Sequence, residues 1–174
     1  MKKVIALLSI FNCTIACSQN LNFRRDSLYQ QLKKAQTPAG QVKAWADIGE
    51  YYGNAGKSDS LQYATEQMLK IASGTHQDSL FAKAYLEIGN YFSNTSDYKQ
   101  ALENQFKSLS FAEKDKSSYD IWLATKEIGV TFKRLKNYSE ALRYLKKAET
   151  FLKQMPSLST DAFNRTYTHF SEVF

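Results

Sequence analysis

Apolar, small and polar positions repeat along this chain at a fixed spacing. The octapeptide over residues 45–52, WADIGEYY, returns twice in related form, and its glycine, Gly49, is matched by Gly89 and Gly129 at intervals of 40 residues. In the first two copies the large apolar residues fall at i, i+3 and i+7, which is one face of an α-helix, and the third copy keeps the last two of these positions. The residues of this face in the second copy are Tyr85, Ile88 and Phe92.

The pattern predicts an all-α protein built from helical hairpins. The chain has only two prolines and seven glycines, so long helices need not be interrupted. Asp97 and Asn137 stand where the second helix of a hairpin would begin, and both are good N-caps. Thr37 and Pro38 would open an earlier helix, and Gly74 would end another. We expect helices over residues 26–36, 41–54, 58–73, 79–94, 97–114, 118–135, 138–154 and 160–174.

Small residues are expected where the two helices of a hairpin cross. Residues 97–102 resemble residues 137–142, and each segment places an alanine four residues after its cap. A glycine inside a helix costs about 1 kcal/mol relative to alanine, so three glycines at one register require close packing to offset that cost. The predicted packing residues are Gly49, Gly89, Gly129, Ala101 and Ala141.

These repeats resemble the tetratricopeptide repeat (TPR) family over residues 41–152 and partly over 160–174. The first copy follows the family pattern W-x2-L-G-x2-Y with isoleucine for leucine. The resemblance implies a right-handed α-solenoid of three hairpins, preceded by an N-terminal helix and followed by half a repeat. It also implies binding of a protein or an extended peptide on the concave face, which the first helix of each unit lines. The arrangement is similar to the exported N-terminal regions of bacterial membrane-bound sensor kinases and regulators.

Counting from the repeat glycine selects the side chains that would line this groove. Two asparagine amides could bind a peptide backbone, and three basic residues of the third unit could meet a carboxylate or an acidic segment. The competing interpretation is a plain solvated face. The family's clamp for a C-terminal carboxylate is not implied, because Ala46 and Glu50 occupy its positions. The predicted groove residues are Lys83, Asn90, Asn94, Lys126, Lys133 and Arg134.

The first nineteen residues have the pattern of an export signal. Lys2 and Lys3 precede a short, mostly apolar stretch that is too short to span a bilayer unaided. The segment ends in a sequence that resembles a bacterial lipobox, so Cys17 is a candidate lipidation site, with simple cleavage near Gln19 as the alternative. We therefore expect a signal at 1–19, a linker and helix at 20–40, repeats at 41–154, and a last helix at 155–174. The protein would be periplasmic or membrane-anchored on the outer side.

Composition and charge add mainly exclusions. The net charge is +6 and the sequence pI is about 9.2, but expected export makes nucleic acid an improbable partner. Both cysteines lie in the signal segment, and neither His76 nor His169 has a companion at metal-ligand spacing. No phosphate-binding loop or hydrolase motif occurs. We therefore expect no cofactor, no metal and no enzymatic activity.

A fourth unit begins at the end of the sequence. Residues 160–174 have the spacing of a first helix, and they could form a capping helix or the start of a repeat that continues in a longer protein. The absence of a second helix favours the longer protein, in which a C-terminal span could provide the membrane attachment. Two functions remain open: a non-catalytic interaction module, and the N-terminal sensor region of a TPR-containing histidine kinase or transcriptional regulator.

Overall fold

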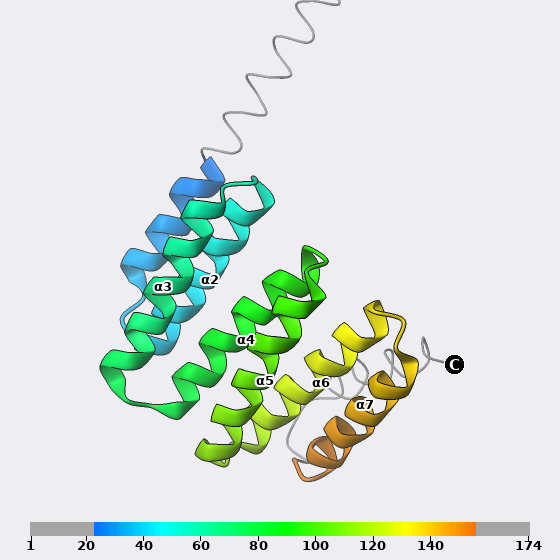
Figure 1. Ribbon diagram of the computed structural model, residues 1–174. Helices are drawn as coiled ribbons and strands as arrows, with labels where there is room; N and C mark the ends of the chain where they lie inside the picture. Colours follow the sequence, from blue (N-terminus) through cyan, green and yellow to red (C-terminus); the bar gives the residue numbers. More distant parts are fainter. Residues whose placement is uncertain (1–22, 156–174) are drawn as a thin grey trace, which may run out of the picture.

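The computed structural model describes residues 23–155, and this part of the chain is all-α, with no strand (Figure 1). The expected all-α class is thus confirmed. The signal segment 1–19 with Cys17 and the expected helix 160–174 lie outside the described residues. Helical residues 23–34 come first. Six labelled helices follow: α2 (Pro38–Asn54), α3 (Ser58–Thr75), α4 (Asp78–Asn94), α5 (Tyr98–Asp115), α6 (Ser118–Arg134) and α7 (Tyr138–Lys153).

Consecutive helices pair into three hairpins that follow one another side by side (Figure 1). The pairs are α2 with α3, α4 with α5, and α6 with α7. We call α2, α4 and α6 the first helices, and α3, α5 and α7 the second helices. The first helices also pack against one another in order, α2 on α4 and α4 on α6, whereas no comparable packing joins α3 to α5 or α5 to α7.

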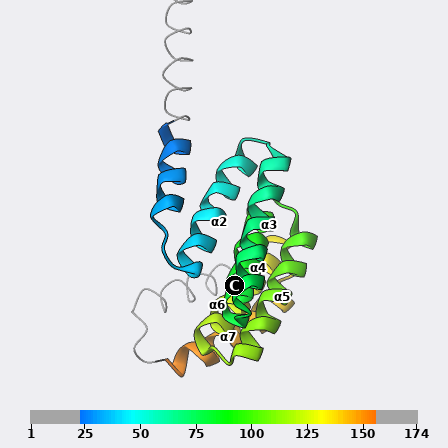
Figure 2. The same cartoon turned by 90° about the vertical axis from the view of Figure 1, so that its left-hand side faces the viewer.

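The helical residues 23–34 lie beside α2, as the rotated view shows (Figure 2). The hydroxyl oxygens of Tyr29 and Tyr52 are 3.4 Å apart and connect this helix to the end of α2. The hydrogen bond with Tyr52, together with burial, raises the pKa of Tyr29 to about 12. Tyr29 therefore remains a neutral phenol, and the first hairpin is covered on this side.

The backbone turns repeat as regularly as the helices. Residues with a left-handed backbone occur every 20 positions, at Gly56 (φ 70°), His76 (53°), Ser96 (67°), Lys116 (56°) and Lys136 (59°). Turns after the first helices share one hydrogen-bond pattern, in which the amide following the left-handed residue donates to a carbonyl five residues earlier. This pattern is the Schellman motif, which satisfies carbonyl groups that a helix end would otherwise leave unpaired.

Most expected helix ends lie within one residue of the observed ones, but the N-terminal helix ends at residue 34 and not 36, α2 begins at Pro38 and not at 41, and one expected stop is wrong. Asp97 and Asn137 cap α5 and α7 by accepting hydrogen bonds from the amides three residues ahead, at 3.2 and 3.3 Å. Thr37 caps α2, with Pro38 at its first position. Gly74 does not end α3. The helix continues through Thr75 to His76, which supplies the left-handed cap, so the repeated turn spacing decides the end of this helix.

The repeat glycines lie where the two helices of each hairpin cross. A Cβ atom added to Gly89 would lie 2.6 Å from Cγ of Gln105 and 3.1 Å from the carbonyl oxygen of Ala101. The equivalent Cβ at Gly129 would lie 2.9 Å from Cγ of Leu145 and 3.3 Å from the carbonyl oxygen of Ala141. Backbone atoms cannot move aside as side chains do. The two helices therefore approach most closely in the second hairpin, where the distance from the added Cβ to a backbone atom is shortest.

Buried apolar side chains fill the spaces between hairpins. One cluster joins the first and second hairpins and contains Val42, Met68, Ala84 and Ile88. A larger cluster joins the second and third hairpins and includes Leu86, Leu109, Ile121 and Ile128. Each hairpin therefore buries apolar side chains both between its own helices and against its neighbour.

Replacing Gly89 by alanine should lower the free energy of unfolding by about 1–2 kcal/mol, because overpacking costs about 1–3 kcal/mol and helix propensity returns at most about 1 kcal/mol. Gly74→Ala is the matched control, since a Cβ there would meet nothing within 4 Å. The control should stabilise the protein by about 0.5 kcal/mol. Urea denaturation of both variants checks this, and equal effects would contradict close packing at Gly89.

Candidate functional site

The first helices carry an acidic residue at the same position in each hairpin. Asp47, Glu87 and Glu127 are 40 residues apart and form what we call the acidic row. The sequence interpretation missed this row, although the three residues share the third place of the repeated octapeptide. An acidic residue two positions before each repeat glycine is the sequence feature that could have predicted this row.

The two outer members of the acidic row have basic partners. Lys43 Nζ lies 2.8 Å from Asp47 Oδ1, and this hydrogen bond raises the pKa of Lys43. Lys126 Nζ lies 2.7 Å from Glu127 Oε1 and also 5.6 Å from the centre of the Trp122 ring. An ammonium group thus lies beside each end of the row, whereas the middle of the row has none in contact among the described residues.

The central member of the acidic row, Glu87, has no ion-pair partner within 4 Å among residues 23–155. Burial raises the pKa of its carboxyl group, because the charged form is poorly solvated. The attraction of Lys43 lowers the same pKa, while repulsion from Asp47, Glu127 and Glu50 raises it further. A cation or a hydrogen-bond donor brought to this position by a partner would stabilise the charged carboxylate.

Glu87 lies between two hollows on the face of the first helices, and it lines both. The smaller, of about 60 Å³, lies between α2 and α4 and is polar; its other lining residues are Lys43, Ala46, Asp47, Glu50, Asn90, Tyr91 and Asn94. The larger, of about 280 Å³, reaches α6 and is more apolar; its other lining residues are Ala39, Val42, Lys43, Lys83, Leu86, Tyr119, Asp120 and Leu123. One face thus offers mixed charge and apolar surface.

Three of the expected groove residues line these hollows. Lys83 is exposed beside the larger hollow and makes no hydrogen bond or ion pair within the described part of the chain. Asn90 lines the smaller hollow, and its Oδ1 accepts a hydrogen bond from Nε2 of Gln105 at 3.2 Å. Asn94 lines the same hollow from the end of α4. The amide nitrogen of Asn90 is therefore the group oriented for a partner's carbonyl.

The three basic residues of the third hairpin do not form one cation cluster. Arg134 Nη1 donates to Asn94 Oδ1 and to Ser93 Oγ, both at 2.9 Å, and so joins the ends of α4 and α6. Lys133 is half-buried one residue earlier. Lys126 is only 8% exposed and is paired with Glu127, so it does not present a free ammonium group as we expected. Its burial follows from the side chain lying over Trp122.

Comparison with protein-family models and with curated proteins finds no match for this chain. Residues 23–155 contain no group of three or more His, Cys, Asp or Glu side chains that could hold a metal ion. No helix in this range is both long enough and apolar enough to cross a membrane.

Replacing Glu87 by glutamine should stabilise the protein at pH 7. Because the folded-state pKa of Glu87 is raised above the ordinary value of 4.5, its charge destabilises the fold at neutral pH. This destabilisation is absent well below pH 4.5, where Glu87 is protonated in both the folded and the unfolded protein. It develops as the pH rises from 4.5 through the raised pKa of the folded state. Urea midpoints should therefore increase for E87Q at about pH 7 and match the parent protein at about pH 4.

Glu103→Gln is the control for this measurement, because Glu103 is exposed and hydrogen bonding to Lys107 lowers its pKa. This variant should show no gain at pH 7. A midpoint of E87Q that is unchanged or lowered at neutral pH would contradict the inferred cost of the partly buried carboxylate.

Proposed function

We propose that this protein is an exported, non-catalytic interaction module of the tetratricopeptide type, which holds an extended peptide segment of a partner along α2, α4 and α6. The observation that carries the proposal is the face of the first helices. On it, a partly buried acidic group without an ion-pair partner among residues 23–155 lies between two hollows that the neighbouring hairpins share. No cofactor and no nucleic acid enter this proposal.

The packing of the helices supports a solenoid that curves toward the first helices, and its right-handed sense is what the resemblance to the tetratricopeptide family implies. Helix α2 packs on α4 and α4 packs on α6, whereas the second helices lack comparable contacts with one another. Hairpins joined along one edge splay apart at the other, and the joined edge becomes the inner side of a curved array. Stacked hairpins of this kind provide extended binding surfaces.

The chemistry of the face supports a peptide as the ligand. An extended backbone presents N–H and C=O groups at regular spacing, and Asn90 and Asn94 carry amides beside the smaller hollow. Leu86 and Leu123 provide apolar wall in the larger hollow for a side chain. Glu87 favours a basic residue or an amide donor, and the exposed Lys83 favours an acidic one. The fitting ligand is thus a segment of mixed charge with an apolar residue.

Export is part of the proposal and rests on the sequence. The charged start, the short apolar stretch and the lipobox-like sequence at Cys17 support delivery to the periplasm, with or without a lipid anchor. No cysteine occurs after Cys17, so the repeats need no disulfide to fold in an oxidising compartment.

Selection of random 12-residue peptides displayed on phage, with the full chain as bait, tests this function. An enriched peptide should carry a basic residue, and titration calorimetry should show binding to the parent protein. Glu87→Gln should weaken that binding about tenfold or more, because a hydrogen bond to a charged group contributes about 1.5–3 kcal/mol. Lys83→Glu should change which peptides are enriched.

Glu103→Gln is again the matched control, since it removes the same charge from a second helix, and it should leave the affinity unchanged within about twofold. Two results would contradict the proposal. One is the absence of any enriched peptide, and the other is equal loss of affinity in the Glu87 and Glu103 variants.

A further inference from the structure

The chain contains two successive junctions between hairpins, and the second is filled by apolar side chains. At this junction the ring of Phe132 stacks on Tyr144, with ring centres 5.6 Å apart. Tyr144 in turn meets Phe106 edge to face at 5.8 Å, and Leu102 packs against the same buried cluster. Tyr144 thus stacks on Phe132, and Phe106 and Leu102 add apolar side chains at the same junction.

The first junction carries polar residues at the three equivalent positions. Phe92 corresponds to Phe132 by the 40-residue period, and the residues in place of Leu102, Phe106 and Tyr144 are Gln62, Glu66 and Asn104. Gln62 Nε2 donates to Glu66 Oε1 at 3.0 Å, and Asn104 Nδ2 donates to the carbonyl of Gln100 at 2.8 Å. These side chains form hydrogen bonds within their own helices, and none of the three supplies an apolar group to the first junction.

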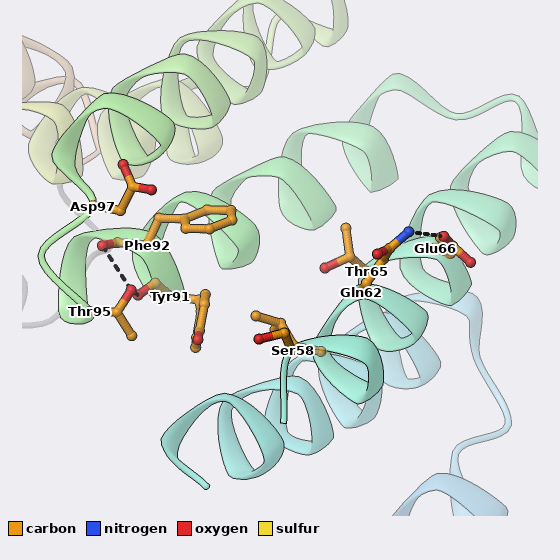
Figure 3. Close-up of a pocket in the computed structure, with 9 residues that line it drawn as sticks. Ser58, Gln62, Thr65, Glu66, Tyr91, Phe92, Thr95 and Asp97 are labelled. Carbon is orange, nitrogen blue, oxygen red and sulfur yellow. Dashed lines mark hydrogen bonds between the residues drawn. The ribbon is translucent and has the colours of Figure 1, made fainter. Parts of the chain in front are cut away.

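A hollow of about 430 Å³ lies at the first junction as a result, within the range of about 300–1,000 Å³ that is usual for ligand sites (Figure 3). Tyr91 and Phe92 extend into it from α4, opposite Ser58 and Thr65 of α3. Its full lining is Ser58, Leu61, Gln62, Thr65, Glu66, Tyr91, Phe92, Thr95 and Asp97. This hollow is separate from the two that Glu87 lines, although Tyr91 borders both regions.

The lining of this hollow is acidic, although the whole chain has a net charge of +6. Glu66 and Asp97 lie at opposite ends of the row of lining side chains (Figure 3), and no Lys or Arg is among them. Each carboxylate accepts a hydrogen bond from a neutral group, Glu66 from Gln62 and Asp97 from the amide of Gln100. Neither has an ion-pair partner among residues 23–155, so both can still attract a cation.

We propose that this hollow binds a segment of a partner protein that carries one large apolar side chain between basic residues. The apolar side chain takes the place that Leu102 and Phe106 take at the next junction, and it covers the rings of Tyr91 and Phe92. The flanking basic residues meet Glu66 and Asp97. This site lies between α3 and α4 and is distinct from the face of the first helices, so either site can exist without the other.

The proposal is tested with the full chain and a pentapeptide that has phenylalanine at its centre, alanine on either side, lysine at both ends and blocked termini. Two-dimensional NMR of labelled protein should show saturable shifts centred on Thr65, Tyr91 and Phe92. Replacing the phenylalanine by alanine should weaken binding at least about tenfold, because a buried phenylalanine contributes about 1.5–3 kcal/mol. Replacing both lysines by glutamate should abolish the shifts.

Two protein variants separate binding in the hollow from nonspecific contact. The double variant Gln62→Leu with Glu66→Phe transplants the filled junction, and it should raise the melting temperature while abolishing peptide binding. Glu66→Lys reverses an exposed charge without filling the hollow, so it should retain the melting temperature and weaken binding. Glu103→Gln removes an exposed charge of α5 that does not line the hollow, so it should leave this binding unchanged.

Three results would overturn the proposal. The first is shifts that do not saturate, or that lie elsewhere on the protein. The second is unchanged binding in Glu66→Lys. The third is self-association of the parent protein that the filled double variant abolishes, because that result would assign the hollow to a second copy of the chain.

Discussion

The close crossing of the two helices within each hairpin is the contact on which the rest of the structure depends. Gly89 has backbone atoms of Ala101 and Gln105 near 3.1 Å from the position a Cβ would occupy, so no larger residue fits without movement. Left-handed turns every 20 residues return the chain to the same register each time. Because each hairpin repeats the same spacing, residues 40 positions apart lie at equivalent places in neighbouring hairpins. Both proposed sites lie where hairpins related in this way meet.

Departures from the repeat are as informative as the repeat itself. The acidic row is conserved in register through three hairpins, but only Glu87 lacks an ion-pair partner among the described residues, because lysines stand beside the other two members. At the second hairpin junction Leu102, Phe106 and Tyr144 are apolar or aromatic, whereas the equivalent positions at the first junction, near Phe92, are polar. A repeat protein thereby keeps one scaffold and places distinct chemistry at particular units.

Local sequence was sufficient for the helices and most of their ends, because caps and periodicity act within a few residues. The cap of Asp97 could be predicted, but the end of α3 could not, since it follows the turn spacing and not Gly74. The burial of Lys126 and the pairing of Arg134 with Asn94 depend on neighbouring helices and side-chain conformations. The hollow at Phe92 could not be predicted, because the sequence does not show which residues of the second helices meet at a junction between hairpins.

Hydrogen–deuterium exchange with and without a bound peptide tests the central claim most directly, because it reports where along the chain a ligand lies. For a peptide selected on the full chain, slower exchange should appear in α2, α4 and α6, including the turns of helix around Glu87 and Asn90, and α5 and α7 should exchange as in the free protein. Protection confined to the second helices, or spread evenly over all hairpins, would contradict a binding face built from the first helices.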